Sequence, residues 1–422
     1  MKYDFLKFIN IQNISSINKW TDGVNPFRFS SISQSDISEP EWYVCSVQLA
    51  NTPIGYVDSI RLNASAGTSI YLEDAITRCL GEAIERYSSS NYFMSETPYY
   101  TTVDKSKKFI RCAESENAPI SFKQNGIKEK IEHTQVLRLT DDSIDFLPYE
   151  TVHLGFLKKD ISLLFTSPIS TGCSFFKDKT TAILKGILEV VERDAMMRWW
   201  YLNFPNAKII KTDEIISFDI QERLRRIKNK NIKVFLFEIS QIMKFPVVFC
   251  LLKGEKFPYA CFGASCDTDI KSAIIKALDE AISIRAMAKW RNEKPNIETT
   301  HFNWISQLSD HMELYANWKD SPIINKIITL NSDIVSINDY HETEIIKTYD
   351  DLQKLALEFA NKGYDIYYKD LTLPEVAHLG NITRVVIPQM IPLSQSYRTR
   401  WLSSLLTDRT INEINPFPQP FS

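Results

Sequence analysis

Apolar residues recur in a single helical phase over three separate stretches of the chain. In the first stretch the apolar positions are Ala75, Ile76, Cys79, Leu80, Ala83, Ile84 and Tyr87. Such spacing places apolar side chains on one face of an amphipathic helix, and that face turns toward a core. We therefore expect a helix that begins near Leu72 and two further helices built in the same way.

The three expected helices share an acidic pattern that begins seven residues after an Ala-Ile pair. The pairs and patterns are Ala75-Ile76 with Glu82-Ala83-Ile84-Glu85-Arg86, Ala182-Ile183 with Glu189-Val190-Val191-Glu192-Arg193, and Ala273-Ile274 with Glu280 and Arg285. Two glutamates three residues apart leave the same face of a helix, one turn from each other. The pattern is an internal repeat, although its copies are too irregular and too far apart for a solenoid.

A short segment rich in small residues precedes each expected helix, at residues 64–69, 170–174 and 262–265, and we expect these segments to be loops. Runs of apolar or alternating residues predict strands elsewhere. These runs are residues 42–49, 136–139, 146–149, 161–165, 234–237, 247–252, 364–370 and 382–387. Residues 1–40 show no clear periodicity and are expected to be an irregular or docking segment, whereas residues 291–360 are expected to be helices and surface connections.

Composition narrows the class of protein. The 422 residues are 44% hydrophobic and 24% charged, which is ordinary for a globular chain with a sizeable core. The net charge of −3 argues against a protein that binds nucleic acid through bulk phosphate attraction. The N-terminus is too polar for a signal peptide, and no apolar run is long enough for a membrane span. The seven Cys residues are scattered without zinc-like spacing, which favours packed thiols in a reducing, cytoplasmic compartment.

One chemical use stands out for the paired glutamates. Hard carboxylate oxygens suit Mg²⁺, which commonly lies between one or two carboxylates and substrate phosphates. Arg86, Arg193 and Arg285 offer bidentate contacts to phosphate oxygens, and the small-residue segments would let backbone N–H groups approach the same phosphates. The alternative is a solvated helix face with ion pairs such as Arg78–Glu82 and Glu82–Arg86, the commoner outcome for a single copy. Three copies at equal offset favour a shared site.

Other familiar active-site motifs are absent from the sequence. No Gly-x-x-x-x-Gly-Lys-Ser/Thr or Gly-x-Gly-x-x-Gly motif is present, which excludes P-loop and Rossmann nucleotide sites. The serine nucleophile motif Gly-x-Ser-x-Gly does not occur either. The six His residues include no pair at metal-ligand spacing, so they are expected to be surface or packed residues.

Taken together, these motifs resemble the YcaO family over roughly residues 60–422. The matching stretches are Ala66-Gly67-Thr68-Ser69 through Leu80-Gly81-Glu82-Ala83-Ile84-Glu85-Arg86-Tyr87, Ser170-Thr171-Gly172 through Leu188-Glu189-Val190-Val191-Glu192-Arg193-Asp194, and Phe262-Gly263-Ala264 through Glu280 and Arg285. Asp370-Leu371-Thr372 and Val385-Val386-Ile387-Pro388 resemble the C-terminal strands of the family. The sequence departs from the family where Lys, Ser, Asn and Gln are usual, at Thr68, Arg78, Thr171 and Ser283.

The resemblance implies an α+β, YcaO-type fold in which repeated strand–loop–helix units surround one site for ATP and Mg²⁺. The metal ligands that it implies are Glu82, Glu85, Glu189 and Glu192. The ATP contacts that it implies come from Arg86, Thr171, Ser174, Arg193, Glu280 and Arg285. The third copy has Ser283 in place of a second acid, so its residues are assigned to phosphate or nucleotide contacts. Residues 61–422 are then the YcaO cyclodehydratase domain, and residues 1–60 an N-terminal docking segment.

A C-terminal Pro-x-Pro-x-Pro, here Pro416, Pro418 and Pro420, resembles the azoline-forming cyclodehydratases of ribosomal peptide natural products. The stretch Gly172-Cys173-Ser174-Phe175 is similar to the stand-alone subunit of microcin-type thiazole/oxazole synthetases. This resemblance implies an ATP-dependent enzyme of bacteriocin or antibiotic biosynthesis. It would convert Cys, Ser or Thr of a precursor peptide to a thiazoline or oxazoline by phosphorylating the amide oxygen. Alternating prolines favour an extended segment, and we expect them to act in catalysis by presenting the tail at the site.

The resemblance also implies partners and leaves alternatives. The sequence has no E1-like, leader-binding domain at its N-terminus, so we expect a separate partner of that kind and a hetero-oligomeric complex. A flavin-dependent dehydrogenase would follow where the rings are oxidised. Two other functions stay open, namely thioamide or amidine formation by the same phosphorylation, and a non-catalytic scaffold subunit of a synthetase complex.

Overall fold

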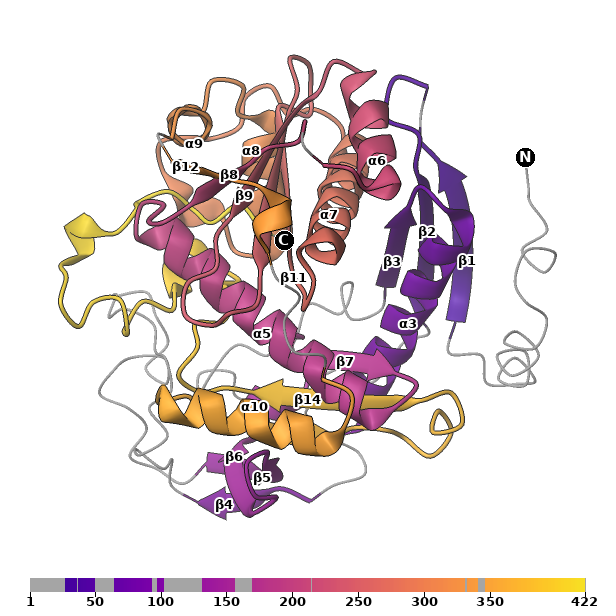
Figure 1. Cartoon of the computed structure of the whole chain (residues 1–422), viewed down its shortest axis with the longest axis vertical. Helices are drawn as coiled ribbons and strands as arrows, with labels where there is room; N and C mark the ends of the chain where they lie inside the picture. Colours follow the sequence, from indigo (N-terminus) through magenta and orange to yellow (C-terminus); the bar gives the residue numbers. More distant parts are fainter. Residues whose placement is uncertain are drawn as a thin grey trace.

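The computed structural model contains three sheets and the helices that cover them (Figure 1). The residues that it describes are 27–35, 37–49, 64–92, 97–101, 131–155, 169–213, 215–330, 332–340 and 346–421. The expected strand at residues 161–165 lies outside these ranges. Helices alternate with strands of mainly antiparallel sheets along the chain, which confirms the predicted α+β class, and β12 with β8 is a parallel pair.

The first sheet is antiparallel and comes from the N-terminal part of the chain. Its strands, in spatial order, are β1 (Phe27–Gln34), β2 (Tyr43–Leu49) and β3 (Ala64–Ser69), and α3 (Leu72–Asn91) follows them. Ala75, Cys79 and Ala83 of α3 pack on this sheet in one apolar cluster. The predicted strand at 42–49 and the predicted start of the helix are confirmed. The expectation of irregular structure is wrong for residues 27–34, because they pair with β2 along their length.

The second sheet joins the middle of the chain to its C-terminal part. In spatial order its strands are β4 (Tyr99–Thr101), β5 (Ile131–Arg138), β13 (Tyr367–Asp370), β14 (Asn381–Val386) and β7 (Cys173–Phe176), and β6 (Ile144–Pro148) also pairs with β5. The helices associated with it are α4 (Tyr149–Val152), α5 (Lys179–Tyr201) and α10 (Tyr349–Asn361). The predicted strands near residues 136, 146, 367 and 382 are thereby confirmed.

The third sheet has the most deeply buried strands. In spatial order they are β11 (Ala260–Cys266), β10 (Val247–Lys253), β9 (Lys233–Glu238), β8 (Lys208–Ile210) and β12 (Asp333–Val335). The helices around it are α6 (Phe218–Lys228), α7 (Ile270–Arg291), α8 (Leu308–Asn317) and α9 (Pro322–Ile328). Strand β10 is buried on both faces, which explains its continuous apolar sequence.

Each glutamate-bearing helix follows a strand that ends its own sheet. β3, β7 and β11 are the terminal strands of the three sheets and lead into α3, α5 and α7. The expectation that the small-residue segments are loops is therefore wrong for residues 64–69 and 262–265. Their small residues instead permit close packing, because a Cβ on Gly67 would meet the backbone of α3 at 2.0 Å and one on Gly263 the backbone of α7 at 2.2 Å.

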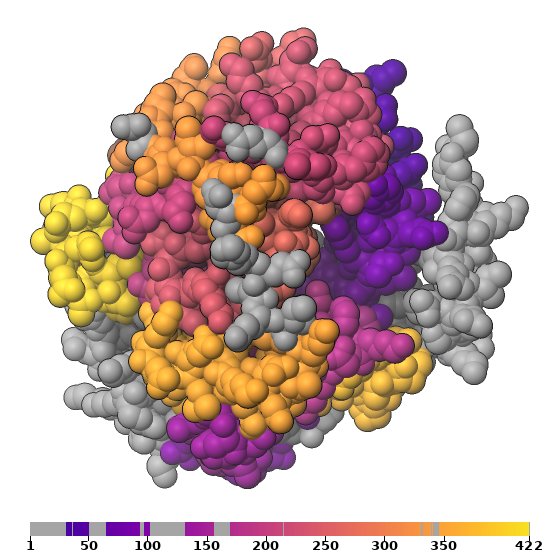
Figure 2. Space-filling view, viewed as in Figure 1, coloured from indigo at the N-terminus to yellow at the C-terminus, as the bar shows by residue number. Residues whose placement is uncertain are grey.

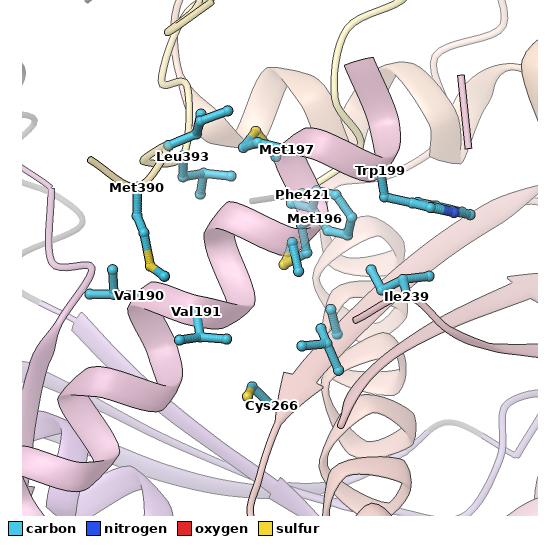
Figure 3. Close-up of a cluster of buried hydrophobic side chains, with 14 of the residues drawn as sticks. Val190, Val191, Met196, Met197, Trp199, Ile239, Cys266, Met390, Leu393 and Phe421 are labelled. Carbon is cyan, nitrogen blue, oxygen red and sulfur yellow. The ribbon is translucent and has the colours of Figure 1, made fainter. Parts of the chain in front are cut away.

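Helix α5 runs obliquely through the middle of the molecule (Figure 1) and supplies much of the largest apolar cluster. Figure 3 shows Val190, Val191 and Met196 of this helix in one cluster with Cys266 of β11 and Phe421 of the tail. Buried residues lie around most of α5, since β11 and the C-terminal segment pack against it. The core thus joins the second repeat, the third repeat and the tail.

The two flanks of the molecule come from different parts of the chain, whereas the C-terminus lies near the middle of the view in Figure 1. In Figure 2 the indigo N-terminal sheet lies on one flank, and a yellow segment near the C-terminal end lies on the opposite flank. None of the helices in the described ranges is long and apolar enough to cross a bilayer.

Candidate functional site

The first glutamate of each repeat is anchored by a backbone N–H in the preceding terminal strand or, for Gly172, directly before that strand. The three hydrogen bonds are Ala66 N–H to Glu82 Oε2 at 2.9 Å, Gly172 N–H to Glu189 Oε2 at 3.0 Å, and Ala264 N–H to Glu280 Oε2 at 2.7 Å. A terminal strand has N–H groups that no neighbouring strand accepts, so a side chain can take them. The repeat in the sequence therefore corresponds to one repeated contact in space.

These contacts correct one hypothesis drawn from the sequence. The small-residue segments were expected to offer their N–H groups to phosphates, but the described N–H groups of Ala66, Gly172 and Ala264 donate to carboxylates. Each bond uses one oxygen of the glutamate and fixes the direction of the other. The strand backbones therefore position the first acid of each repeat.

Two arginines lie among the carboxylates. Arg86 Nη2 lies 3.1 Å from Glu82 Oε1, and Arg193 lies 3.4 Å from Glu192 and 3.9 Å from Glu189. The Nε–H groups of both arginines are buried and meet no acceptor among the described residues. A buried donor without an acceptor costs about 1–3 kcal/mol, so the matched pair fits an additional oxygen-rich ligand.

Burial raises the pKa of the buried glutamates in the three repeats. Charges from one repeat also act on glutamates of the others, which shows that the repeats converge. Desolvation is the largest cause for Glu85, Glu189, Glu192 and Glu280, and nearby arginines oppose it. The charge of Glu189 further raises the pKa of Glu85, Glu192 and Glu280. The side chains of Glu82 and Glu189 are nevertheless 33% and 28% exposed, so solvent reaches acids that are otherwise desolvated.

The second repeat also contacts the third directly. Glu192 Oε2 accepts a hydrogen bond of 2.9 Å from the N–H of Cys266, at the end of β11. Because Glu192 is also close to Arg193, its carboxylate links α5, β11 and the arginine pair. Its position is therefore fixed by two elements that are far apart in the sequence.

Arg384 was not predicted from the sequence. Its buried guanidinium donates to the carbonyls of Thr151 and Ile169 and lies 3.3 Å from Cys173 Sγ. Its charge lowers the pKa of Glu85 and Glu189, which places it beside the carboxylates. One signal was available, because a charged residue interrupts the apolar run of β14.

The donor set fits a hard cation bound together with a ligand that supplies further oxygens. Five carboxyl groups outnumber three arginines, Arg86, Arg193 and Arg384; the five are Glu82, Glu85, Glu189, Glu192 and Glu280. Within the described ranges no three His, Cys, Asp or Glu side chains form a ready-made metal-binding group. Mg²⁺ bound through one or two carboxylates and phosphate oxygens requires no such group.

Other predicted residues lie apart or have structural partners. Arg285 is buried, and its guanidinium contacts Glu39 at 2.5 Å and the carbonyl of Pro258 at 2.7 Å. It therefore does not join the cluster formed by the glutamates of the three repeats. Ser174 Oγ donates to the carbonyl of Ala182. Thr171 is buried beside the anchoring N–H of the second repeat.

The tail residues 416–421 are packed rather than free. Their carbonyl groups accept hydrogen bonds from Tyr397 at Pro416, Trp200 at Phe417, Tyr315 at Pro418 and His311 at Gln419. Pro416 is exposed, whereas Pro418 and Pro420 are buried. Phe421 lies 5.7 Å from Phe249, ring to ring, in the cluster that contains Cys266 (Figure 3). The tail therefore ends near the strand that contacts Glu192.

Comparison with known proteins gives one family. The family described as YcaO cyclodehydratase, ATP- and Mg²⁺-binding, matches residues 66–391. No curated protein matches the sequence.

Solved structures share the fold at low identity. A heterocyclase in complex with substrate and cofactor is 16% identical with a TM-score of 0.75, covering 96% of this chain and 57% of its own. This chain thus spans little more than half of that protein. YcaO from Methanopyrus kandleri, bound with AMPPCP and Mg²⁺, is 16% identical with a TM-score of 0.61, and 90% of this chain and 91% of that one are covered. The E. coli microcin synthetase McbBCD complex with pro-MccB17 bound is 13% identical with a TM-score of 0.62, at 93% and 96% coverage.

Proposed function

The chain belongs to the YcaO cyclodehydratase family, whose members bind ATP and Mg²⁺, and on that premise we propose that it is the catalytic subunit of an ATP-dependent peptide cyclodehydratase. The observation that carries the proposal is the meeting of three backbone-anchored glutamates around Arg86 and Arg193. Excess carboxylate charge suits cations, and the two buried Nε–H groups suit anionic oxygens. A cation and a phosphate ligand together satisfy both.

We assign the residues to two roles. Metal binding is assigned to the two complete pairs, Glu82, Glu85, Glu189 and Glu192. Arg86, Arg193 and Glu280 lie in the same cluster and are assigned to the nucleotide. Contacts of Thr171, Ser174 and Arg285 with the nucleotide stay predictions, and the Glu39 pair of Arg285 supports a structural role for that residue.

The proposed reaction makes one ring and releases one water equivalent. A Cys, Ser or Thr side chain attacks the preceding amide carbonyl, and ATP supplies the phosphoryl group that makes the former carbonyl oxygen a good leaving group. Phosphoryl transfer releases ADP, and the former carbonyl oxygen departs as phosphate. Loss of the S–H or O–H proton of the attacking side chain and of the amide N–H proton completes the thiazoline or oxazoline, so the peptide loses one oxygen and two hydrogens. Arg86 and Arg193 would neutralise charge on the transferred group, so the protein acts by positioning and electrostatics.

The tail has a proposed role at the same site. Four side chains hold its carbonyl groups, and Phe421 packs against Phe249 of β10, the strand next to β11, which contacts Glu192. Pro416, Pro418 and Pro420 would keep this segment extended at a low ordering cost. We assign it the task of closing and ordering the reaction site.

The proposed substrate and partners are based on analogy with the structural relatives. One relative was solved with its substrate and cofactor, and another is a synthetase complex with pro-MccB17 bound. By analogy, we propose a precursor peptide as substrate and a hetero-oligomer that contains an E1-like, leader-binding partner, with a flavin-dependent dehydrogenase where rings are oxidised. Residues 1–60 would contact that partner and residues 61–422 form the catalytic domain. Strands β1 and β2 of the N-terminal segment form one sheet with β3 of the catalytic domain, so the segment is attached to that domain through this sheet.

The proposal is tested by ATP turnover with a candidate peptide and partner chain. We expect phosphate release that depends on both, together with loss of water from the peptide by mass spectrometry. Phosphate release with gain of sulfur or of an amine would indicate thioamide or amidine formation. Normal complex assembly without phosphate release would show a scaffold and overturn the catalytic assignment.

A further inference from the structure

A second charged pattern repeats with the glutamates, one helical turn before them. A basic residue stands four positions before the first glutamate of each repeat: Arg78 before Glu82, Lys185 before Glu189, and Lys276 before Glu280. Residues four apart share one face of a helix. Since the three glutamates converge, the three basic residues should converge as well, about 6 Å along each helix from the acids.

A contact between helices places Arg78 of α3 beside α7, and the charges of Lys276 and Arg78 act on Lys185 of α5. Arg78 of α3 reaches Asp279 of α7 at 2.7 Å, and Lys276, one turn earlier on α7, contacts Asp267 at 2.5 Å. Helices α3 and α5 both pack against β7 (Figure 1). The pKa of Lys185 is lowered first by burial and then by the charge of Lys276, Asp267 opposes this shift, and Arg78 lowers the pKa further.

The nearby acids do not neutralise this basic group. Asp279 is shared with Arg223, which contacts it at 2.9 Å, and Asp267 serves Lys276. The ion pairs among the described residues include none to Lys185, whose ammonium lies 5.1 Å from the centre of the Phe176 ring. Four cations therefore meet two carboxylates, and two positive charges are left over. The side chains of Arg78 and Lys276 are 36% and 42% exposed, so a dissolved ligand can reach them.

We propose that Arg78, Lys185 and Lys276 form an anion site that holds the phosphate chain of the nucleotide on the side away from the metal ligands. The inference rests on the proposed function, since it names a further part of the same site. The carboxylates would face Mg²⁺ and the basic group would face phosphate oxygens, and one helical turn separates the two. Arg78 is a departure from the family pattern, so this basic group characterises the present chain.

The test compares nucleotides that differ in phosphate number. We expect Lys185→Met to weaken binding of Mg·ATP at least tenfold by titration calorimetry, to weaken Mg·ADP less, and to change AMP less than twofold. Lys185→Arg keeps the charge and should bind within threefold of the native chain. Lys179→Met is the matched control, because Lys179 lies on the same helix but pairs with Asp370. Circular dichroism would verify the fold of each variant.

Inorganic tripolyphosphate separates this inference from the proposed function. Tripolyphosphate should bind the native chain and bind Lys185→Met at least tenfold more weakly, whether or not any peptide is modified. Unchanged Mg·ATP affinity in Lys185→Met would overturn the anion site. Equal losses for AMP and ATP would overturn it too, by assigning Lys185 to ribose or base. A native chain that binds neither polyphosphate would refute the site and the proposed function together.

Discussion

Glu189 shows how one side chain can hold a position and keep its charge. One oxygen accepts the N–H of Gly172, and the other side of the carboxylate faces Arg193. Glutamine preserves the shape and the acceptor oxygen but removes the charge. We predict that Glu189→Gln folds normally and lowers heterocycle formation at least about 100-fold, measured by mass spectrometry of the peptide.

The control for this prediction is Glu358→Gln. Glu358 is exposed and pairs with Lys244 at 3.5 Å, a surface contact worth about 0–1 kcal/mol. Its removal should leave product formation unchanged. Native-like product from Glu189→Gln would show that this carboxylate is not a metal ligand.

The buried cysteines provide a prediction about reactivity. Burial raises the pKa of the Cys261 thiol to about 12 and also raises the pKa of Cys250. At pH 8 a thiol with that pKa is about one ten-thousandth thiolate, the reactive form. We predict that iodoacetamide labels both residues slowly in the native protein and rapidly in guanidinium chloride, with labelled peptides identified by mass spectrometry. Rapid native labelling would contradict the burial described for these strands.

At this scale the glutamates were predictable and some of their partners were not. Three copies at equal offset identified the acids, because chance seldom repeats a spacing. Arg285 occupies the position that matches Arg86 and Arg193 only loosely, and its guanidinium meets Glu39 from an unrelated segment. A long-range ion pair of this kind leaves no trace in local sequence.

The packing of each glutamate-bearing helix on its strand depends on a few positions where the two backbones lie very close together. A Cβ at Gly263 would lie 2.2 Å from the carbonyl oxygen of Ala277, so α7 would have to move away from β11. We predict that Gly263→Ala lowers the free energy of unfolding by about 1–3 kcal/mol in urea titrations. It should also weaken Mg·ATP binding, because Glu280 is anchored across the same contact.

Gly81→Ala is the corresponding control. A Cβ there would meet Phe175 at 3.6 Å, an ordinary contact, and alanine is the better helix former by about 0.5–1 kcal/mol. This variant should be as stable as the native chain or more so. Equal stability of the Gly263→Ala and native chains would mean that α7 can shift without cost.

The tail gives a prediction about a segment rather than a single acid. Tyr315 donates to the carbonyl of Pro418 at 2.6 Å in the buried interior, whereas Tyr397 donates to the more exposed Pro416 at 2.7 Å. Loss of a buried hydrogen bond costs about 1–3 kcal/mol. We predict that Tyr315→Phe lowers kcat more than it changes KM for the peptide, and that Tyr397→Phe has the smaller effect. Equal kinetics of Tyr315→Phe and native enzyme would make the tail a structural terminus only.

Deletion of residues 416–422 tests the tail less cleanly. We expect it to suppress turnover more than peptide affinity, but it also removes Phe421 from the core. Its effect on activity must therefore be read beside an unfolding curve. The hydroxyl variants avoid this difficulty, since the rings remain in place.

Helices were predictable at this scale because their apolar spacing is set locally. The small-residue strands were not, since glycine and, to a lesser degree, alanine are depleted in strands. In this fold their small size serves packing against the following helix, as at Gly67 and Gly263. Strand β1 lacks a clean alternation in its sequence and is defined by pairing with β2.

The assembly of three sheets around one site predicts coupling between ligand and stability. The acids come from helices attached to all three sheets, so a bound cation and nucleotide would connect them. Mg·ATP at about 100 times its Kd would add about 2.7 kcal/mol to the free energy of unfolding. We predict a higher Tm with Mg·ATP and loss of that rise when EDTA is added. An equal rise in the presence of EDTA would refute the metal assignment.

The meeting of the sheets could not be derived from the sequence. Strand order in the second sheet places β7 beside β14, which is about 200 residues later in the chain. Pairings at such separation depend on the whole fold. The sequence predicted that three helices share a site, and the structure adds that each reaches it from the terminal strand of a different sheet.

The anchoring bonds also bear on how far such a sequence can diverge. The donors at Ala66, Gly172 and Ala264 are main-chain groups, which every residue except proline supplies. Mutations along these strands can therefore accumulate without moving a carboxylate, provided that the tightly packed glycines stay small. A TM-score of 0.75 at 16% identity is compatible with that tolerance, in which geometry is inherited through the backbone while side chains drift.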